Sequence, residues 1–263
     1  MKTWMISGAL ASLFLLALTG LFFFMATRGA LLVRGLVSGS HGEKAHVYPI
    51  YSNIRLIKLV DFQPIISAIL LFQYDRLVSK IVSELMQSDL KNKKVLVTSC
   101  AFGNVIPLVV KTVVQAGAER VLIVDIINNQ LVHAKSKLDH FSGKVDFIEE
   151  NATAMKQRDG IVDANVMFFL LHELPHHLKG QALIEAGRML KPGGKLFLAE
   201  FHRPDLWILR ALSWTYFKVF EPLGLALWDT CDPLGCLENM GGWTCECTTY
   251  FFGNFQIIIA TKQ

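Results

Sequence analysis

The sequence predicts an α/β protein: a doubly wound, mostly parallel sheet that ends in an antiparallel hairpin and is preceded by an N-terminal transmembrane helix. Three observations predict this class. Short β-branched runs alternate with helical stretches between residues 77 and 200, the pattern that crossover connections give a parallel sheet. Two β-rich runs separated by Gly253-Asn254 close the chain as a hairpin. A charge-free apolar run opens it.

The composition narrows the classes of function. The chain has 263 residues, of which 52% are hydrophobic and 18% charged, and its mean hydropathy is +0.39. This composition excludes disorder, collagen and coiled coil, and it is more apolar than that of an ordinary soluble domain. The net charge of +4 comes from basic residues spread along the chain, so no basic block indicates nucleic acid. A basic balance remains compatible with membrane lipid as a partner.

The N-terminal run extends from residue 4 to residue 26, 23 residues without a charge, which is long enough to cross the ~30 Å hydrocarbon core as a helix. We therefore predict a transmembrane anchor at residues 1–27. A cleaved signal peptide and a buried core helix are the alternatives. Arg28, Arg34 and Lys44 follow the run, against Lys2 before it, which favours a body on the cytoplasmic (or matrix) side.

Residues 28–74 are predicted to be a linker and interfacial segment, because glycines and Pro49 interrupt the pattern. Its apolar stretch at 64–72 is too short to span a bilayer, so we expect it to pack on the body or to lie at the membrane surface, where it could form a lipid-facing entry to the active site. Residues 75–263 form the globular unit.

Within this unit the apolar spacing predicts the elements in order. A helix leads into the first strand, and strands and helices then alternate, apart from two consecutive strands. The helices are expected at 77–86, 105–116, 129–138 and 179–189. The strands are expected at 95–97, 121–124, 145–148, 165–170 and 195–200, followed by the hairpin strands at 248–252 and 255–260.

The cysteines do not predict a disulfide framework. There are five, an odd number, and the expected compartment is reducing. Cys231, Cys236, Cys245 and Cys247 have C-x4-C and C-x-C spacing, which differs from the usual C-x2-C pairs of zinc sites. Zinc binding stays open as an alternative.

The first candidate site follows the first two strands, because ligands of open α/β sheets bind beyond the carboxyl ends of the strands. The first strand runs into a turn of small residues, Ser99-Cys100-Ala101, with Gly103 two positions later. Small residues let the backbone approach a cofactor closely. The second strand ends in Asp125, about twenty residues on, where a carboxylate can accept both hydroxyls of a ribose.

With LKPGGK before the fifth strand (190–195), this turn and acid resemble the class I S-adenosylmethionine-dependent methyltransferases over residues 75–263. The resemblance implies a Rossmann-like fold and S-adenosylmethionine as cofactor. It assigns three positions of the glycine-rich turn, the ribose acid and an adenine contact: Ser99, Ala101, Gly103, Asp125 and the pair Asn151-Ala152. Val97 stands where the family has an acid near the methionine end of the cofactor.

The second candidate site follows the fourth and fifth strands. His172 and Glu173 come after the fourth strand, and His202, with Asp205 behind it, comes after the fifth. Adjoining strand ends bring these side chains towards one crevice, where they can act as general acid, general base or ligands of a hard metal. Helix capping by Glu173 and solvated histidines are the structural alternatives.

The runs CAFGN (100–104), FFLLHELP (168–175), EFHRPDLW (200–207) and FEPLGLALW (220–228) resemble the rhodoquinone biosynthesis proteins. That resemblance implies replacement of a ring methoxy group of ubiquinone by an amino group. S-adenosylmethionine would donate the nitrogen, and a divalent metal, manganese, would be held by His172, Glu173 and His202. The prenylated quinone would explain the apolar run at 207–228, as an oily lid or as core packing.

Two other functions remain open at this point. One is a conventional methyltransferase acting on a quinone or another lipid. The other is a non-catalytic, membrane-bound module of a quinone-synthesis complex.

Overall fold

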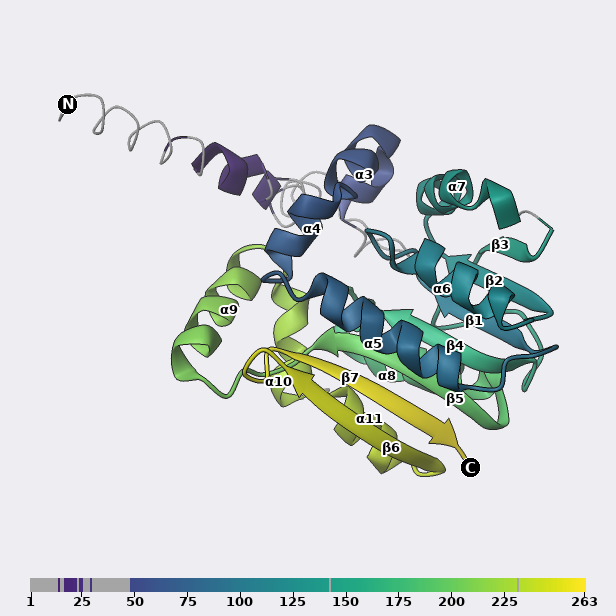
Figure 1. Ribbon diagram of the computed structural model, residues 1–263. Helices are drawn as coiled ribbons and strands as arrows, with labels where there is room; N and C mark the ends of the chain where they lie inside the picture. The colour runs from purple at the N-terminus through teal and green to yellow at the C-terminus, as the bar shows by residue number, and fades with distance from the viewer. Residues whose placement is uncertain are drawn as a thin grey trace.

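A computed structural model describes residues 14, 17–22, 24–25, 29, 48–141, 143–230 and 232–263. Its centre is a seven-stranded sheet in the order β3-β2-β1-β4-β5-β7-β6 (Figure 1). The strands are β1 (Lys94–Thr98), β2 (Arg120–Asp125), β3 (Val145–Glu149), β4 (Val162–Phe168), β5 (Leu190–Phe201), β6 (Trp243–Tyr250) and β7 (Phe255–Lys262). β1 to β5 are parallel, and β7 pairs antiparallel with both β5 and β6. The predicted class I methyltransferase fold is confirmed.

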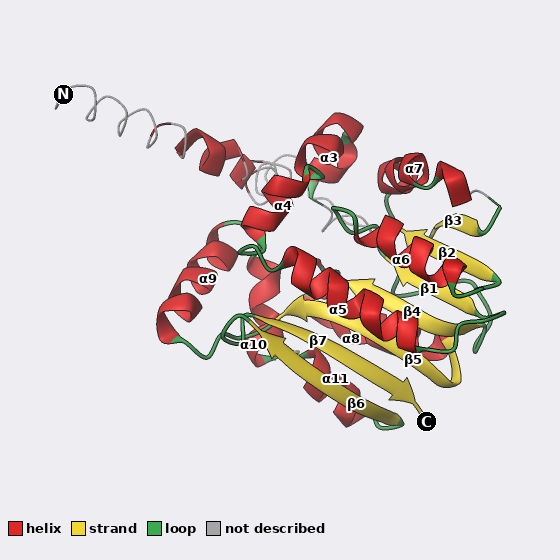
Figure 2. Cartoon of the chain, in the orientation of Figure 1, coloured by secondary structure: helices red, strands yellow, loops and turns green. Residues whose placement is uncertain are grey.

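The central strands are apolar because both faces of the sheet are covered. Val95, Leu96 and Val97 of β1 are all buried, as expected for a parallel strand between two layers of helices. Figure 2 shows α5 and α6 in front of the sheet and α8 and α11 behind it. The helices described are α3 (Ile54–Val60), α4 (Gln63–Ile69), α5 (Tyr74–Gln87), α6 (Val105–Gln115), α7 (Asn128–Lys137), α8 (His176–Met189), α9 (Trp207–Val219), α10 (Ala226–Asp229) and α11 (Pro233–Met240).

The turn between β6 and β7 differs from the predicted two-residue turn. Four residues, Phe251 to Asn254, connect the strands, and Phe251, Phe252 and Gly253 all have positive φ. Asn254 is buried, and its Oδ1 accepts a hydrogen bond from the Ser213 hydroxyl at 2.8 Å. The turn is longer than predicted because Asn254 is tied to α9.

The segment predicted as an irregular linker is partly helical. The 3-10 helix η2 (Pro49–Ser52), α3 and α4 all lie within it. Tyr48, Ile50, Tyr51 and Val60 form a small apolar cluster separate from the main core, and Phe102 and Ile127 of the globular unit pack against it. We call residues 48–70 the N-terminal strap.

No helix among the described residues is long and apolar enough to cross a membrane. Most of the predicted anchor at 1–27 lies outside the described residues, as does Cys231. Cys100, Cys245 and Cys247 are free thiols.

Candidate active site

The turn after β1 has the backbone shape expected of a glycine-rich cofactor turn. Ser99 has φ 78, the left-handed region that glycine adopts without cost. Gly103 has φ 85, and a Cβ there would collide with the Tyr74 hydroxyl. That hydroxyl accepts a hydrogen bond from the Val105 amide at 2.8 Å at the start of α6. The turn therefore requires glycine at 103 and keeps its conformation with serine at 99.

Asp125 ties this turn to the end of β2. Its Oδ2 accepts from the backbone amide of Cys100 at 2.7 Å, and its Oδ1 accepts from that of Ile127 at 2.8 Å. The side chain is buried. Because each carboxylate oxygen has a second lone pair, Asp125 can hold the turn and still accept hydrogen bonds from a ligand.

A second carboxylate fixes the same turn from the N-terminal strap. Asp61 accepts from the Gly103 amide at 2.6 Å and is paired with Lys137 at 2.6 Å and with His133 at 2.8 Å. Lys137 also donates to the Gly103 carbonyl at 2.8 Å. Nothing in the sequence pattern marked Asp61, because it belongs to the segment read as a linker.

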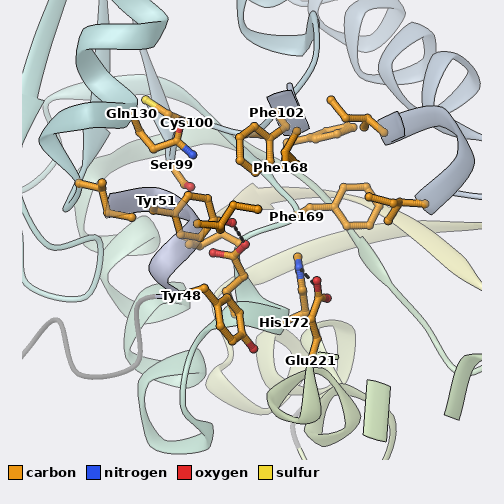
Figure 3. Close-up of a pocket in the computed structure, with 18 of the residues that line it drawn as sticks. Tyr48, Tyr51, Ser99, Cys100, Phe102, Gln130, Phe168, Phe169, His172 and Glu221 are labelled. Atoms are coloured by element: carbon orange, nitrogen blue, oxygen red, sulfur yellow. Dashed lines mark hydrogen bonds and ion pairs between the residues drawn. The ribbon is translucent and has the colours of Figure 1, made fainter. Parts of the chain in front are cut away.

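One cavity of about 280 Å³ connects the cofactor turn with the second candidate site. At one end it is lined by the turn after β1 and by Asp125, Ile126, Ile127 and Gln130. At the other end, as Figure 3 shows, Tyr48, His172 and Glu221 surround it. Apolar side chains form most of the wall between the two ends, among them Ile66, Ile69, Leu70, Phe168, Phe169 and Phe201.

His172 lies between two buried carboxylates. Its Nδ1 donates to Glu200 Oε1 at 3.1 Å, and its Nε2 lies 3.6 Å from Glu221 Oε2. The backbone amide of His172 donates to the other oxygen of Glu200 at 3.2 Å. Lys179 of α8, itself buried, donates to the carbonyls of Leu171 and Leu174 and so fixes the short helix η4 (Leu171–Glu173) that carries the histidine.

Glu173 faces the cavity from the same short helix. The Tyr51 hydroxyl of the N-terminal strap donates to its carboxylate (Figure 3), and the Tyr51 ring stacks on Phe102 with centroids 5.6 Å apart. Tyr216 of α9 donates to Glu221 Oε1 at 3.1 Å. Two tyrosines from outside the sheet therefore hold the carboxylates of Glu173 and Glu221.

Burial sets the protonation states at this end of the cavity. Burial raises the pKa of Glu173 to about 7, against the lowering by His172 and by the Tyr51 hydrogen bond. For His172, burial disfavours the charged ring, but the carboxylates of Glu200 and Glu221 outweigh it and raise the pKa to about 9. Burial also raises the pKa of Glu221. A carboxyl near neutrality beside a charged imidazole is an acid–base pair for pH 7–9.

The structure brings together only part of the predicted site. Ser99, Cys100, Ala101, Asp125, His172 and Glu173 all line the cavity. Gly103 does not line it but shapes the turn. Asn151 and Ala152 are absent from its wall: Asn151 Oδ1 instead accepts from the amide and the hydroxyl of Thr153, at 3.0 and 2.9 Å.

The predicted metal site, His172, Glu173 and His202, does not assemble. His202 is not in the cavity wall, because its Nδ1 hydrogen-bonds to the Gly253 carbonyl at 2.6 Å in the long β6–β7 turn. Within the part of the chain that is described, no three His, Cys, Asp or Glu side chains converge on a position for a metal ion. This also applies to the zinc alternative for Cys236, Cys245 and Cys247.

Sequence reasoning missed Tyr48, Tyr51, Tyr216 and Glu221. The strand-end rule finds only residues that follow strands, and these four lie in the strap and at α9. Glu221 stands inside the run FEPLGLALW, which contributes to the family resemblance but was given no site residue. An acid in the middle of an apolar run is the signal that marks such a residue.

Replacing Glu173 with glutamine is expected to stabilise the protein at alkaline pH. Its pKa is about 7 when folded against 4.5 in the unfolded chain, so folding disfavours the ionised form and stability falls as pH rises from 4.5 through 7. Glutamine stays neutral, so the variant should gain about 3 kcal/mol over wild type near pH 8 and much less near pH 5. Urea unfolding at the two pH values measures this. Glu119→Gln at an exposed ion pair is the matched control, and an equal gain at both pH values would contradict the assignment.

Comparison with known proteins agrees with this fold. The sequence profile of the ubiE/COQ5 methyltransferase family matches residues 52–232. A ubiquinone/menaquinone biosynthesis C-methyltransferase of Methylobacterium nodulans is 33% identical over 114 residues, 42% of this chain and 44% of that protein. One from Salmonella arizonae is 30% identical over 119 residues, 43% and 45% of the two chains. The chain thus matches less than half the length of these curated relatives.

Among solved structures, an S-adenosylmethionine-dependent methyltransferase from Aquifex aeolicus superposes with a TM-score of 0.54 at 19% identity, over 80% of this chain and 99% of that one. An O-methyltransferase family protein from Burkholderia thailandensis gives 0.59 at 15% identity, over 82% and 62%. These likenesses establish the fold.

Proposed function

The chain belongs to the ubiE/COQ5 methyltransferase family, and on that premise we propose that it is an S-adenosylmethionine-dependent transferase acting on the ring of a prenylated quinone. The observation that carries the proposal is the single cavity that joins the cofactor turn and Asp125 to His172 and Glu173. The curated relatives named above are C-methyltransferases of quinone biosynthesis, which supports a quinone as the acceptor.

The residues at one end of the cavity fit the nucleoside part of the cofactor. The Asp125 carboxylate has lone pairs for the ribose hydroxyls, and Ile126 and Ile127 offer apolar contact to a base. Ser99 to Ala101 present backbone rather than bulky side chains to the cavity. When bound there, S-adenosylmethionine supplies an activated group for transfer.

The other end fits a quinone ring. The buried hydroxyl of Tyr48 and the Oε2 atom of Glu221 have no hydrogen-bond partner among the described residues. Buried polar atoms without partners cost stability unless a ligand satisfies them. The Tyr48 hydroxyl can donate to a quinone carbonyl, while the aromatic wall of Phe169 and Phe201 packs against the ring.

The transferred group is the finer part of the proposal. We favour the replacement of a ring methoxy group by an amino group, because Val97, buried and apolar, stands where class I methyltransferases have an acid near the cofactor's amino group. Without that carboxylate the amine is more easily deprotonated and can act as a nucleophile. His172, charged up to about pH 9, would protonate the methoxy oxygen as its bond to the ring breaks and methanol leaves. Glu173 would then accept the proton of the carbon that carries the donated nitrogen, with the quinone ring taking up the two electrons, so that water can hydrolyse the bond between that carbon and the nitrogen.

Methyl transfer to a quinone ring is the second candidate, and membership of the ubiE/COQ5 family favours it. Here Glu173, with a pKa of about 7, would accept the ring proton that the methyl group replaces. The manganese site that the closer resemblance implied does not fit the residues present, so neither reaction is routed through a metal.

One experiment separates these outcomes. The full chain in detergent is incubated with ubiquinone and with S-adenosylmethionine that carries nitrogen-15 in its amino group and carbon-13 in its methyl group, with and without manganese. Because the ring of ubiquinone has no hydrogen that a methyl group can replace, a parallel reaction contains a prenylated quinol that keeps one ring hydrogen. Mass spectrometry of the quinones should then detect a nitrogen-15 aminoquinone. A carbon-13 methylated quinone would establish the second candidate instead.

If no product forms, the melting temperature with and without S-adenosylmethionine distinguishes the two possible reasons. A ligand at about 100 times its dissociation constant adds about 2.7 kcal/mol to stability. Stabilisation by S-adenosylmethionine without product would reject the quinone acceptor. No stabilisation and no product would favour a non-catalytic module.

A further inference from the structure

The outer face of α9 is apolar although no described residue covers it. Trp207, Ile208 and Leu212 are 71%, 49% and 64% exposed, and at 100° per residue they fall on one side of the helix with Trp214 and Val219. The opposite side, with Phe217 and Tyr216, packs on the body. A helix that is apolar on both sides is normally buried on both sides.

Two further exposed aromatic residues lie at the same end of the sheet. Phe72, between α4 and α5, is 79% exposed, and Phe252, in the β6–β7 turn, is 64% exposed. Arg76 stacks over the Tyr250 ring at 5.1 Å, which places the start of α5 beside the end of β6. Figure 1 shows the α4–α5 and β6–β7 turns beside α9. We call Phe72, Trp207, Ile208, Leu212, Trp214 and Phe252 the apolar rim.

Two exposed aromatic residues of the rim, Phe72 and Phe252, have a strained backbone conformation. Phe72 has φ 59 and Phe252 has φ 53, the left-handed region, which is strained for a bulky residue. Both rings point away from the core at that cost. Exposed aromatic residues held in this way are expected where they contact a partner.

The charge around the rim identifies the partner. α3, α4 and α9 contain Arg55, Lys58, Arg210 and Lys218 and no Asp or Glu. Lys218 lies over the Trp214 ring at 5.5 Å. The acids beside the rim are Asp75, in the first turn of α5, and Asp205, whose carboxylate lies against Gly253. The apolar and aromatic side chains of α3, α4 and α9, interspersed with basic charges only, match the acyl chains and anionic headgroups of a phospholipid leaflet.

The rim is also continuous with the cavity and with the N-terminal segment. Ile69 and Leu70 from α4, and Tyr216 and Phe220 from α9, line the cavity. Leu18 and Phe22, part of the charge-free run, form a second depression together with Leu59 and Ile65 of the strap. The segment predicted to enter the membrane therefore joins the body beside the cavity.

We propose that the apolar rim lies in the surface of a phospholipid bilayer, and that the prenyl tail of the substrate passes from the bilayer into the cavity between α4 and α9. The second clause rests on the proposed function, whereas the first does not. The rim holds the cavity against the leaflet, so an insoluble tail reaches it without crossing water.

Quenching of tryptophan fluorescence by brominated lipid tests the first clause. The full chain is reconstituted into phosphatidylcholine–phosphatidylglycerol vesicles with plain or brominated acyl chains, as wild type, as the Trp207→Phe/Trp214→Phe variant and as Trp243→Phe. The fluorescence of Trp207 and Trp214, measured as the difference between wild type and the double variant, should be at least about twofold weaker in brominated vesicles than in plain ones. Trp243 lies at the other end of β6 from the rim. Its fluorescence, measured as the difference between wild type and Trp243→Phe, should be equal in plain and brominated vesicles. Equal rim emission in both vesicles would overturn the proposal, including the case in which a second copy of the chain covers the rim.

Turnover tests the second clause. Ile208→Glu/Leu212→Glu should lower the ratio of rates on long-tailed and short-tailed quinone in vesicles by about tenfold or more, because charged side chains are strongly disfavoured at a lipid-facing position. Ile184→Glu, at an exposed isoleucine of α8, is the matched control. An unchanged ratio would overturn entry from the bilayer. Failure of the proposed function would leave both quinones unmodified while the quenching persists, so the two failures are distinguishable.

Discussion

Replacing His172 with glutamine is expected to lower the rate of product formation by about 10²- to 10⁴-fold, the usual contribution of a positioned acid or base. Glutamine keeps a hydrogen-bonding group near Glu200 but carries no charge and transfers no proton near neutral pH. The affinity for S-adenosylmethionine should stay within about twofold of wild type, because the cofactor end of the cavity does not include His172. Isotope-labelled product analysis and calorimetric titration of the cofactor measure the two effects.

The variant also leaves Glu200 and Glu221 without their charged neighbour, so its fold needs a separate check by circular dichroism and melting temperature. His177→Gln, at an exposed position of α8, is the matched control and should keep full activity. In the wild type, the rate should rise as Glu173 ionises around pH 7 and fall as His172 loses its proton around pH 9. A folded His172→Gln enzyme with wild-type turnover would reject the acid–base role.

Replacing Asp125 with alanine is expected to weaken S-adenosylmethionine binding by about 10- to 100-fold, since hydrogen bonds to a charged group contribute about 1.5–3 kcal/mol. Two effects combine: the ribose loses its acceptor, and the amides of Cys100 and Ile127 lose theirs. Asp125→Asn retains one carbonyl oxygen and should lie between alanine and wild type. Titration calorimetry measures the three affinities.

Asp146→Ala removes a strand carboxylate that pairs with Arg120 at 3.0 Å on the surface, outside the cavity, and serves as the control. It should bind the cofactor as the wild type does. If Asp125→Ala bound S-adenosylmethionine with unchanged affinity, the cofactor would have to occupy a different part of the cavity.

The sheet was predictable because its information is local. Each strand is a short apolar run next to a helical stretch, and the right-handed crossover rule then leaves few topologies. β1 to β5 and their helices accordingly appear within a few residues of the expected bounds. The hairpin was placed correctly, but its turn was not, because the hydrogen bond from Ser213 to Asn254 joins residues 41 positions apart.

The part of the active site that follows strands was predictable from local sequence, and the rest was not. Strand ends meet at one edge of a parallel sheet, so Asp125 and His172 could be found without a structure. His202 also follows a strand, but a backbone carbonyl in the β6–β7 turn determines its orientation. Tyr51 and Glu221 reach the cavity only through tertiary packing of segments that carry no strand signal, and a one-dimensional pattern does not encode such contacts.

The N-terminal strap contributes no strand to the sheet, but it contributes side chains to the active site. A chain beginning at residue 75 would keep all seven strands, yet it would lose Tyr48, Tyr51 and Asp61, which close the cavity and hold the cofactor turn. Tyr48 and Tyr51 belong to an apolar cluster separate from the main core, so changes at these two positions alter the acceptor end of the cavity without removing a side chain from the core of the sheet. A lineage with this architecture can therefore evolve towards a new acceptor or a new transferred group through an appended segment, at little risk to the inherited domain.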